Sequence, residues 1–317
     1  MTKIKNIINQ GIVIRSTGSW YEVRTSSGEI ISCRFKGKFK IAGIKSTNPI
    51  AVGDKVSFIR AKNEETAVID GIKKRENYII RKSINLSKQT HIIAANIDHA
   101  FLVITISQPR TSLGFIDRFL LSTEAYHIPV ILIFNKLDLN SPKEQAIQDE
   151  WIEKYKKIGY KSVQTSALKG EGIDEIKQLM KDGTNMFSGH SGVGKSALIN
   201  SIQKGLKLKT AEISGFNLKG RHTTTFAEMH PLDIGGYIID TPGIKEFGVV
   251  DIKKEDVGGY FPEMKKLMHL CKFNNCLHKN EPQCAIKDAV ENGIIAQSRY
   301  NNYLAIINDD DAHKKPF

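Results

Sequence analysis

The chain has 317 residues, of which 40% are hydrophobic and 25% charged, so it can form two or three domains with buried cores. It has no run of about 18 or more apolar residues, and residues 1–10 lack the apolar stretch and cleavage site of a signal peptide. These features exclude a transmembrane helix and favour a cytoplasmic protein that makes no membrane contact.

Residues 1–75 carry most of the excess positive charge. The formal net charge of the chain is +12, and this segment holds 15 Lys and Arg against 6 Asp and Glu. Positive charge of this size is common in soluble domains, but its concentration at one end of the chain favours a polyanionic partner.

The same segment is predicted to form a small all-β barrel. Short β-branched and aromatic runs begin at Gly11, Trp20, Glu29 and Val52, with turn residues between them. About five strands are typical of an oligonucleotide-binding (OB) barrel, whose sheet face and loops hold nucleic acid, although an SH3-like barrel would give a similar pattern. A long basic insertion contains Lys36, Lys38, Lys40 and Lys45. The aromatic residues are expected mostly in the core: Trp20, Tyr21, Phe35 and Phe39.

Residues 76–90 are polar and basic and are predicted to be a linker, and the pattern changes after them. Nearly continuous apolar strands alternate with helical stretches from residue 91 to about residue 250. This alternation is typical of a parallel sheet covered on both faces, so we predict a doubly wound α/β domain over residues 91–250. Its strands begin at His99, Val130 and Lys161, and its first helices cover residues 116–126 and 142–157.

A phosphate-binding pattern, G-H-S-G-V-G-K-S, lies between a strand-like segment and a helical segment. Its glycines let backbone N–H groups turn toward the phosphates, Lys195 neutralises the β- and γ-phosphate oxygens, and the Ser196 hydroxyl binds Mg²⁺. The pattern alone predicts a nucleoside triphosphatase of unspecified base, with Lys195 in a catalytic role. The predicted phosphate-contacting residues are Gly189, His190, Ser191, Gly192, Val193, Gly194, Lys195, Ser196 and Ala197.

The run N-K-L-D, which follows the strand at residues 130–134, predicts that the base is guanine. The Asp138 carboxylate can accept hydrogen bonds from guanine N1–H and the 2-amino group, Asn135 can meet the opposite edge, and the Lys136 stem can cover the ring. A site that hydrogen-bonds a substrate group rejects an analogue lacking it by roughly 10⁴-fold, which favours GTP over ATP. A T-S-A run resembles the loop that backs the guanine oxygen. The predicted base-contacting residues are Asn135, Lys136, Leu137, Asp138, Ser166 and Ala167.

Two further motifs are predicted to contact Mg²⁺ and the γ-phosphate. In D-T-P-G, the Asp240 carboxylate can hold Mg²⁺ through water, and the Gly243 N–H can contact the γ-phosphate. The run K-G-R-H-T-T-T offers Thr224, with Thr223 as its neighbour, as an Mg²⁺ ligand in the triphosphate state.

The residue after D-T-P-G is Ile244, where many GTPases have a glutamine that orients the attacking water. Isoleucine cannot orient water, so we expect slow intrinsic hydrolysis. His222 is the nearest residue with suitable chemistry to position the water, although a loop histidine is also suited to solvent or to a nucleic-acid contact. An activating partner could instead reorder the site.

Three cysteines and one histidine lie close together, in the spacing C-x4-C-x-H-x5-C. Three thiolates and one imidazole can close a tetrahedral site for one structural Zn²⁺, whereas disulfides would leave an odd cysteine. The predicted zinc ligands are Cys271, Cys276, His278 and Cys284. Helical spacing at residues 253–268 and 285–304 predicts a small α-helical zinc module over residues 251–317 with a disordered tail from Asp309. Cys33 is expected to be core packing.

The base motif precedes the phosphate loop, which is a circular permutation of the order in small GTPases. With R-H-T-T-T, D-T-P-G, the cysteine spacing and the basic barrel, this order resembles the ribosome small subunit-dependent GTPase A family over about residues 11–304. The resemblance implies three parts: an OB-type barrel, a permuted P-loop GTPase domain and a zinc module. It also implies a monomer that binds the small (30S) ribosomal subunit and its 16S rRNA, assists late maturation, and hydrolyses GTP to GDP when the subunit stimulates it.

Two alternatives stay open. Ile244 is consistent with an RNA-binding scaffold whose nucleotide pocket binds without turnover. A permuted GTPase that serves another RNA, such as a tRNA or a large-subunit precursor, would share most of the motifs. Phosphate release with and without small subunits separates the first alternative, and co-sedimentation with purified subunits separates the second.

Overall fold

The computed structural model describes residues 7–35, 49–60, 64–82, 90–206, 227–240 and 252–308, without the side chains of residues 7, 8, 81, 82, 90 and 91. The chain divides into two compact units. The first contains Met1–Asp98, Met180–Met186 and Leu206–Ile244, and the second contains His99–Leu179, Phe187–Gly205 and Lys245–Phe317. The domain boundaries expected from the sequence, after residues 75, 90 and 250, stay a prediction.

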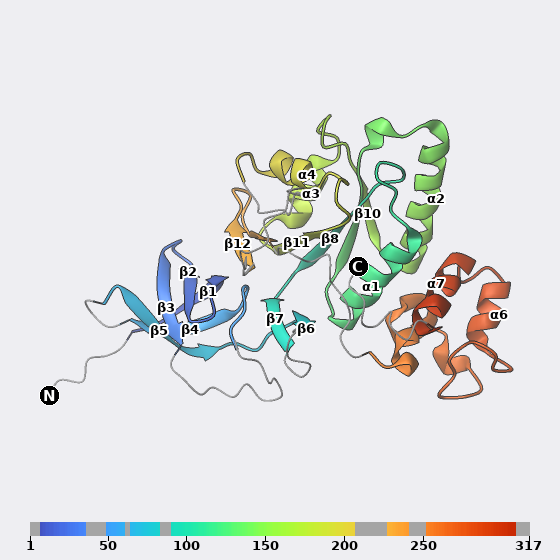
Figure 1. Cartoon of the computed structure of the whole chain (residues 1–317), viewed down its shortest axis with the longest axis horizontal. Coiled ribbons are helices and arrows are strands. Elements are labelled where there is room, and N and C mark those ends of the chain that lie inside the picture. The colour runs from blue at the N-terminus through green and yellow to red at the C-terminus, as the bar shows by residue number, and fades with distance from the viewer. Residues whose placement is uncertain are drawn as a thin grey trace, which may run out of the picture. The chain divides into compact units, whose positions relative to one another are not determined.

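Five strands in the first unit close into a barrel (Figure 1, blue), which confirms the predicted N-terminal fold. They pair in the order β1-β2-β3-β5-β4, and β4 returns to β1, so each of the five has two neighbours within the barrel. Only β3 and β5 run parallel within the barrel. The strands are β1 (Ile7–Ser16), β2 (Trp20–Thr25), β3 (Ile30–Phe35), β4 (Lys55–Arg60) and β5 (Thr66–Ile72).

Alternate residues of the barrel strands face its core, as the period of a strand requires. Tyr21 and Cys33 are fully buried there, and burial raises the pKa of the Cys33 thiol to about 12. Phe35 packs against this core, whereas Trp20 lies on the surface with the Arg34 guanidinium 4.0 Å above its ring. The expectation of a core position was therefore wrong for Trp20. Phe39 and the four insertion lysines lie outside the described residues.

A strand lies inside the segment that was predicted to be a linker. Strand β6 (Tyr78–Lys82) pairs antiparallel with β7 (Thr90–Ala95), and Ile79 is buried in this two-stranded sheet. Strand β6 has few apolar residues, and polar and basic residues surround it in the sequence, so the sequence pattern did not indicate a strand there. Residues 78–82 therefore form a strand that the sequence pattern did not predict, and the linker role of residues 76–90 stays a prediction.

Three strands of the first unit belong to the nucleotide-binding part of the sequence: β11 (Thr184–Ser188), β12 (Glu228–Pro231) and β13 (Tyr237–Asp240). Strand β13 runs parallel to β11 and antiparallel to β12. Strand β12 meets the barrel strand β1 at the pair Arg15 and Glu228, whose side chains form an ion pair at 3.2 Å. Strand β11 enters the second unit at Phe187.

The second unit contains a parallel sheet in the order β10-β9-β8, with helices between its strands, as predicted (Figure 1, green). All five residues of β9 are buried. The strands are β8 (His99–Ile104), β9 (Val130–Phe134) and β10 (Lys161–Gln164). The helices are α1 (Leu113–Ala125), α2 (Pro142–Ile158), α3 (Ile173–Met180) and α4 (Lys195–Ile202), with a 3-10 turn η1 (Leu137–Leu139).

The C-terminal part of the second unit is made of short helices around their own core (Figure 1, orange and red). They are η3 (Lys254–Tyr260), α5 (Pro262–Lys265), η4 (Met268–Leu270), α6 (Ala285–Glu291) and α7 (Gln297–Asn308). Leu121 of α1 belongs to the same core. No described helix is long and apolar enough to cross a membrane. The tail predicted to be disordered lies outside the described residues.

Candidate nucleotide and metal sites

The phosphate-binding pattern forms a loop between β11 and α4, as the sequence predicted. Gly189, Gly192 and Gly194 all have positive φ, of 141°, 83° and 97°. A Cβ atom at Gly189 would lie 2.5 Å from the carbonyl oxygen of Val103, and one at Gly194 would lie 2.4 Å from the Asn135 side chain. Side chains at these two positions would therefore force neighbouring atoms to move, so the loop requires glycine there.

Lys195 lies at the start of α4 and folds back over the loop. Its ammonium group donates hydrogen bonds to the carbonyl oxygens of Gly189 and His190, each at 2.7 Å. Phosphate oxygens are charged and therefore stronger acceptors than these carbonyls. The first N–H groups of a helix also lack intrahelical partners and favour an anion. The loop and the start of α4 can therefore bind a phosphate chain.

Asn135 connects three separate segments of the site. It follows β9 and is 2% exposed. Its side-chain NH₂ group donates to the carbonyl oxygen of Val193 in the phosphate loop at 2.9 Å. Its side-chain oxygen accepts from the Thr165 hydroxyl at 3.0 Å and from the Ala167 N–H at 3.4 Å. Asn135 therefore fastens the N-K-L-D motif to the phosphate loop and to the T-S-A loop, and its direct contact with a base stays a prediction.

Asp138 and Lys136 are each held by a neighbouring loop. The Ser166 hydroxyl donates to Asp138 Oδ1 at 2.5 Å and accepts from the Lys169 N–H at 3.2 Å. Lys136 has a left-handed backbone, with φ of 66°, and its ammonium group donates to the carbonyl oxygen of Gln108 at 2.6 Å. One carboxylate oxygen of Asp138 is thereby oriented, and a carboxylate can accept further hydrogen bonds at its other oxygen.

The loop between β8 and α1 also belongs to the site, although the sequence analysis did not single it out. The Gln108 carbonyl accepts from Lys136, and a Cβ atom on Gly192 would lie 3.4 Å from the Pro109 ring. Hydrogen bonds between Thr105 and Thr111 close this loop at its base. The sequence could have indicated this loop, because it follows a predicted parallel strand and ligands bind at the carboxyl ends of such strands.

His190 of the phosphate loop stacks on Phe115 of α1. Their ring centroids lie 3.9 Å apart, with 30° between the ring planes. Partial burial, and next the positive charge of Lys195, lower the pKa of the imidazole. A histidine whose pKa lies below its usual value of about 6.5 is neutral at pH 7. The phosphate loop therefore presents a neutral aromatic ring that is supported from α1.

The residues predicted for Mg²⁺ and for water are only partly described. Asp240 ends β13 in the first unit and is 7% exposed. Thr224, His222, Gly243 and Ile244 lie outside the described residues, so their roles stay predictions.

The four predicted zinc ligands are brought together, with all four ligand atoms within 4.8 Å of one another. The His278 Nδ1 atom lies 3.6 Å from Cys271 Sγ and 3.4 Å from Cys284 Sγ. Tetrahedral Zn²⁺ with Zn–S of about 2.3 Å and Zn–N of about 2.0 Å separates S from N by about 3.5 Å. His278 and two of the cysteines are buried. The donor set therefore fits a closed structural zinc site.

Glu281 orders the turn that carries His278. Its carboxylate accepts hydrogen bonds from the backbone N–H groups of Leu277, Lys279 and Asn280, at 2.8, 2.7 and 3.1 Å. These bonds lower the pKa of Glu281 against a raising effect of burial. Sequence spacing alone did not single out Glu281, because it is not a ligand.

Comparison with known proteins identifies the family. Residues 72–250 match the family described as RsgA GTPase, and residues 10–69 match the RsgA N-terminal domain. A Flavobacterium psychrophilum protein named small ribosomal subunit biogenesis GTPase RsgA is 55% identical, over 95% of this chain and 93% of its own. The chain belongs to the RsgA GTPase family. A second RsgA, from Bacteroides fragilis, is 52% identical over 96% of this chain and 98% of its own.

Two solved structures are also similar to this RsgA family member. YjeQ from Thermotoga maritima is 35% identical, with a TM-score of 0.80 over 96% of this chain and 98% of its own. YloQ, described as a circularly permuted GTPase, is 30% identical, with a TM-score of 0.77 over the full length of both chains. These comparisons confirm the predicted family and the fold class of barrel, permuted GTPase and C-terminal cysteine module. As an RsgA family member, the chain is a GTP hydrolase.

Proposed function

We propose that this chain is a GTPase of small ribosomal subunit biogenesis, which binds the 30S subunit through its 16S rRNA and assists late maturation. Relatives at 52 to 55% identity carry the name small ribosomal subunit biogenesis GTPase RsgA. The basic first 75 residues suit an RNA partner, because a cluster of Lys and Arg attracts the phosphate backbone. We expect it to act in the cytoplasm as a monomer bound to the subunit.

The contacts of Asn135 carry the nucleotide part of this proposal. The bond from Asn135 to Val193 joins the base motif to the phosphate loop, and the bonds to Thr165 and Ala167 join it to the T-S-A loop. These bonds support one nucleotide site made from segments far apart in the chain, in which Asp138 would meet the base and the loop at residues 189–194 would meet the phosphates. The proposed nucleotide contacts are Asn135, Lys136, Leu137, Asp138, Ser166, Ala167, Gly189 through Ala197, Asp240 and Gly243.

Two metals complete the proposal. Ser196 and Thr224 would hold Mg²⁺, which neutralises charge on the β- and γ-phosphates when it is bound with GTP. One Zn²⁺ would be held by Cys271, Cys276, His278 and Cys284, whose ligand atoms already lie at suitable separations.

Hydrolysis is proposed to depend on the subunit. Lys195 would stabilise charge on the phosphates, and His222 is the candidate to position the attacking water because Ile244 cannot. Intrinsic turnover should therefore be slow, and binding of the subunit would reorder the site for hydrolysis to GDP and phosphate.

Calorimetry and phosphate release test the proposal directly. Titration of the full-length protein with GDP and Mg²⁺ should give a saturable complex. GTP-dependent phosphate release should rise on addition of purified small subunits and should stay at its basal rate with large subunits. Absence of release in both cases would favour a nucleotide-binding RNA scaffold without turnover. Preferential co-sedimentation with large subunits would favour a permuted GTPase that acts on another RNA.

A further inference from the structure

Helix α1 is shared between the nucleotide site and the C-terminal helices. Leu121 of α1 lies in the hydrophobic core that η3, α5, α6 and α7 form. In the first turn of α1, a Cβ atom on Gly114 would lie 3.6 Å from the side-chain oxygen of Asn302 on α7. Helix α1 therefore packs against the C-terminal elements at Gly114 in its first turn and again at Leu121.

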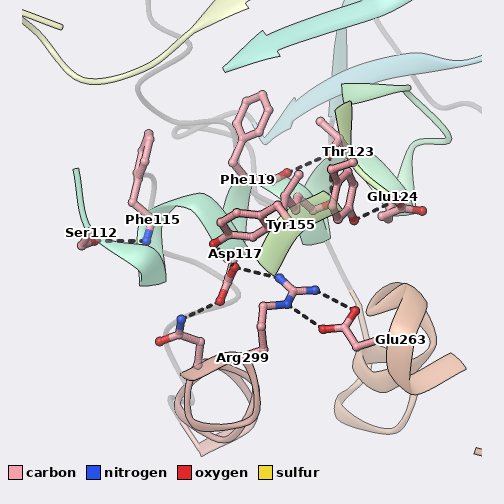
Figure 2. A network of polar contacts seen from close by, with 12 residues as sticks. Ser112, Phe115, Asp117, Phe119, Thr123, Glu124, Tyr155, Glu263 and Arg299 are labelled. Carbon is pink, nitrogen blue, oxygen red and sulfur yellow. Dashed lines mark hydrogen bonds and ion pairs between the residues drawn. The ribbon is translucent and has the colours of Figure 1, made fainter. Parts of the chain in front are cut away.

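A buried polar network joins α1 to α7 (Figure 2). Arg299 donates to Asp117 Oδ1 at 2.8 Å and to the two oxygens of Glu263 on α5 at 2.6 and 3.1 Å. The side chains of Arg299 and Asp117 are 2% and 1% exposed. Tyr155 of α2 donates to the same Asp117 oxygen at 2.7 Å, and Asn302 donates to the other oxygen. One guanidinium thus lies between the buried Asp117 carboxylate and the partly buried Glu263 carboxylate.

Phe115 connects the same helix to the phosphate loop. Its ring stacks on His190 at a centroid distance of 3.9 Å, and its N–H donates to the Ser112 hydroxyl at 3.1 Å. Two positions turn an α-helix by about 200°, so Phe115 and Asp117 leave α1 on opposite sides. Figure 2 shows Asp117 directed toward Arg299 and Phe115 directed away from it. Helix α1 therefore lies between the phosphate loop and the buried network.

We propose that Arg299 is a positioning residue for the nucleotide site, because it fixes α1 through Asp117 and α1 in turn holds Phe115 against His190. This inference rests on the guanine-nucleotide site proposed above. It assigns to the C-terminal helices an effect on nucleotide affinity that does not require them to touch the nucleotide.

The electrostatics of the network explain why Arg299 matters. Without its guanidinium, the Asp117 and Glu263 carboxylates would face each other at a buried site and repel. Helix α1 would then shift relative to α7, and the phosphate loop would lose the ring that Phe115 supplies. Binding linkage is reciprocal, so bound nucleotide should also stabilise α7.

The dissociation constant for GDP, measured on the full-length zinc-loaded protein with Mg²⁺, tests this role. Arg299→Gln and Phe115→Leu should each weaken GDP binding by about tenfold. Because both changes act through one contact, the double variant should bind within about twofold of the weaker single variant. The matched control is Arg75→Gln, which breaks a barrel ion pair with Asp54 whose side chains are 8% and 0% exposed. This control should retain the wild-type affinity for GDP.

Hydrogen exchange supplies a second test that does not depend on the folding of an Arg299 variant. In the wild-type protein, GDP should slow amide exchange across α7, from Gln297 to Asn308. At saturating GDP, Phe115→Leu should show no such protection of α7. A residue that only stabilised the fold would lower thermal stability and leave this response to GDP unchanged.

The outcomes separate the two proposals. If the wild-type protein does not bind GDP, the proposed nucleotide site is wrong. If it binds GDP and Arg299→Gln binds within about twofold of it, or if the two effects multiply in the double variant, the positioning role is wrong. Should Arg299→Gln fail to fold, GDP binding to the wild-type protein without protection of α7 would overturn the role.

Discussion

At the residue scale, Asp138 has the chemistry that selects a guanine base. Ser166 orients its carboxylate through a short hydrogen bond. A carboxylate accepts about four hydrogen bonds, so capacity remains for the N1–H and 2-amino donors of guanine. Adenine has an acceptor at N1, which would face the carboxylate without a proton between them.

Replacement of Asp138 by asparagine should change the preferred base. An amide side chain can donate to the 2-carbonyl of xanthine, so Asp138→Asn should weaken GTP binding by roughly 10²-fold or more relative to xanthosine triphosphate. Competition of each nucleotide against labelled GDP measures this ratio. Asp174→Asn, on an aspartate with a 96% exposed side chain, is the control and should retain wild-type selectivity. Unchanged selectivity in Asp138→Asn would remove the role given to Asp138.

His190 should make stability depend on pH in a defined direction. Its pKa is lowered in the folded chain, by burial and then by Lys195, relative to about 6.5 in an unfolded chain. As pH falls through that value, the unfolded state takes up a proton before the folded state, so the free energy of unfolding decreases. Between about pH 7.5 and pH 5.5, wild type should lose more stability than His190→Gln in urea titrations. Parallel pH profiles for the two proteins would contradict this assignment.

At the scale of elements, the C-terminal helices should depend on zinc. They are short, and the turn between η4 and α6 contains all four ligands. Binding of structural Zn²⁺ is worth roughly 10 to 16 kcal/mol in small zinc modules, far more than helices of this length supply. Chelation should therefore accelerate amide exchange in α6 and α7 while β2 and β3 of the barrel keep their protection.

A matched pair of cysteine variants checks the metal itself. Cys284→Ser should lose zinc, measured as metal content of the purified protein, and should show the same loss of protection in α6 and α7. Cys33→Ser, in the barrel core, should keep its zinc. Equal zinc content in the two variants would show that the cluster is not the metal site.

The same elements show what the sequence pattern could predict. Strand β9 was predicted at its observed bounds, because five consecutive apolar residues after a helical stretch fit a buried strand better than any other element. The helix expected over residues 253–268 is instead three short pieces, and the first break falls at Phe261, whose backbone is extended before Pro262. Strand β6 was missed because its apolar run is short. Local pattern therefore predicts a strand whose residues are all apolar and buried, such as β9, and fails for a strand of the same length with few apolar residues, such as β6.

The sequence singles out residues for the candidate nucleotide site, but it does not show the contacts between them. Motif spacing predicts Asn135, Asp138 and Lys195 as site residues because binding of phosphate and guanine requires those residue types. The bond from Asn135 to Val193 spans 58 positions, and the stack of His190 on Phe115 joins the phosphate loop to helix α1. Such contacts depend on how the sheet brings loops together, so a single sequence carries no direct signal for them.

At the scale of the whole molecule, the excess positive charge and the candidate nucleotide site lie in different parts of the chain. Residues 1–75 carry the basic excess, and the phosphate loop and base motif lie in the second unit. On the barrel surface, Trp20 lies under the Arg34 guanidinium, an arrangement compatible with stacking on a base. Binding to the proposed rRNA partner should therefore be dominated by counterion release from the barrel side.

Neutralisation of the basic insertion should flatten the salt dependence of binding to the small subunit. Each lysine that contacts a phosphate contributes about 0.7 to 0.9 to the slope of log affinity against log salt. A triple variant with glutamine at Lys36, Lys38 and Lys40 should bind more weakly at low salt, with a slope reduced by about 2 to 3. Sedimentation binding at several salt concentrations measures both quantities.

The control removes the same charge elsewhere. Glutamine at Lys143, Lys156 and Lys157, which are exposed on α2, lowers the net charge equally without touching the barrel. If the insertion contacts rRNA phosphates, only the barrel variant changes the slope, because counterion release requires close contact. A slope reduced equally in both triple variants would mean that net charge alone guides binding. An unchanged slope in the variant at Lys36, Lys38 and Lys40 would exclude the insertion from the interface.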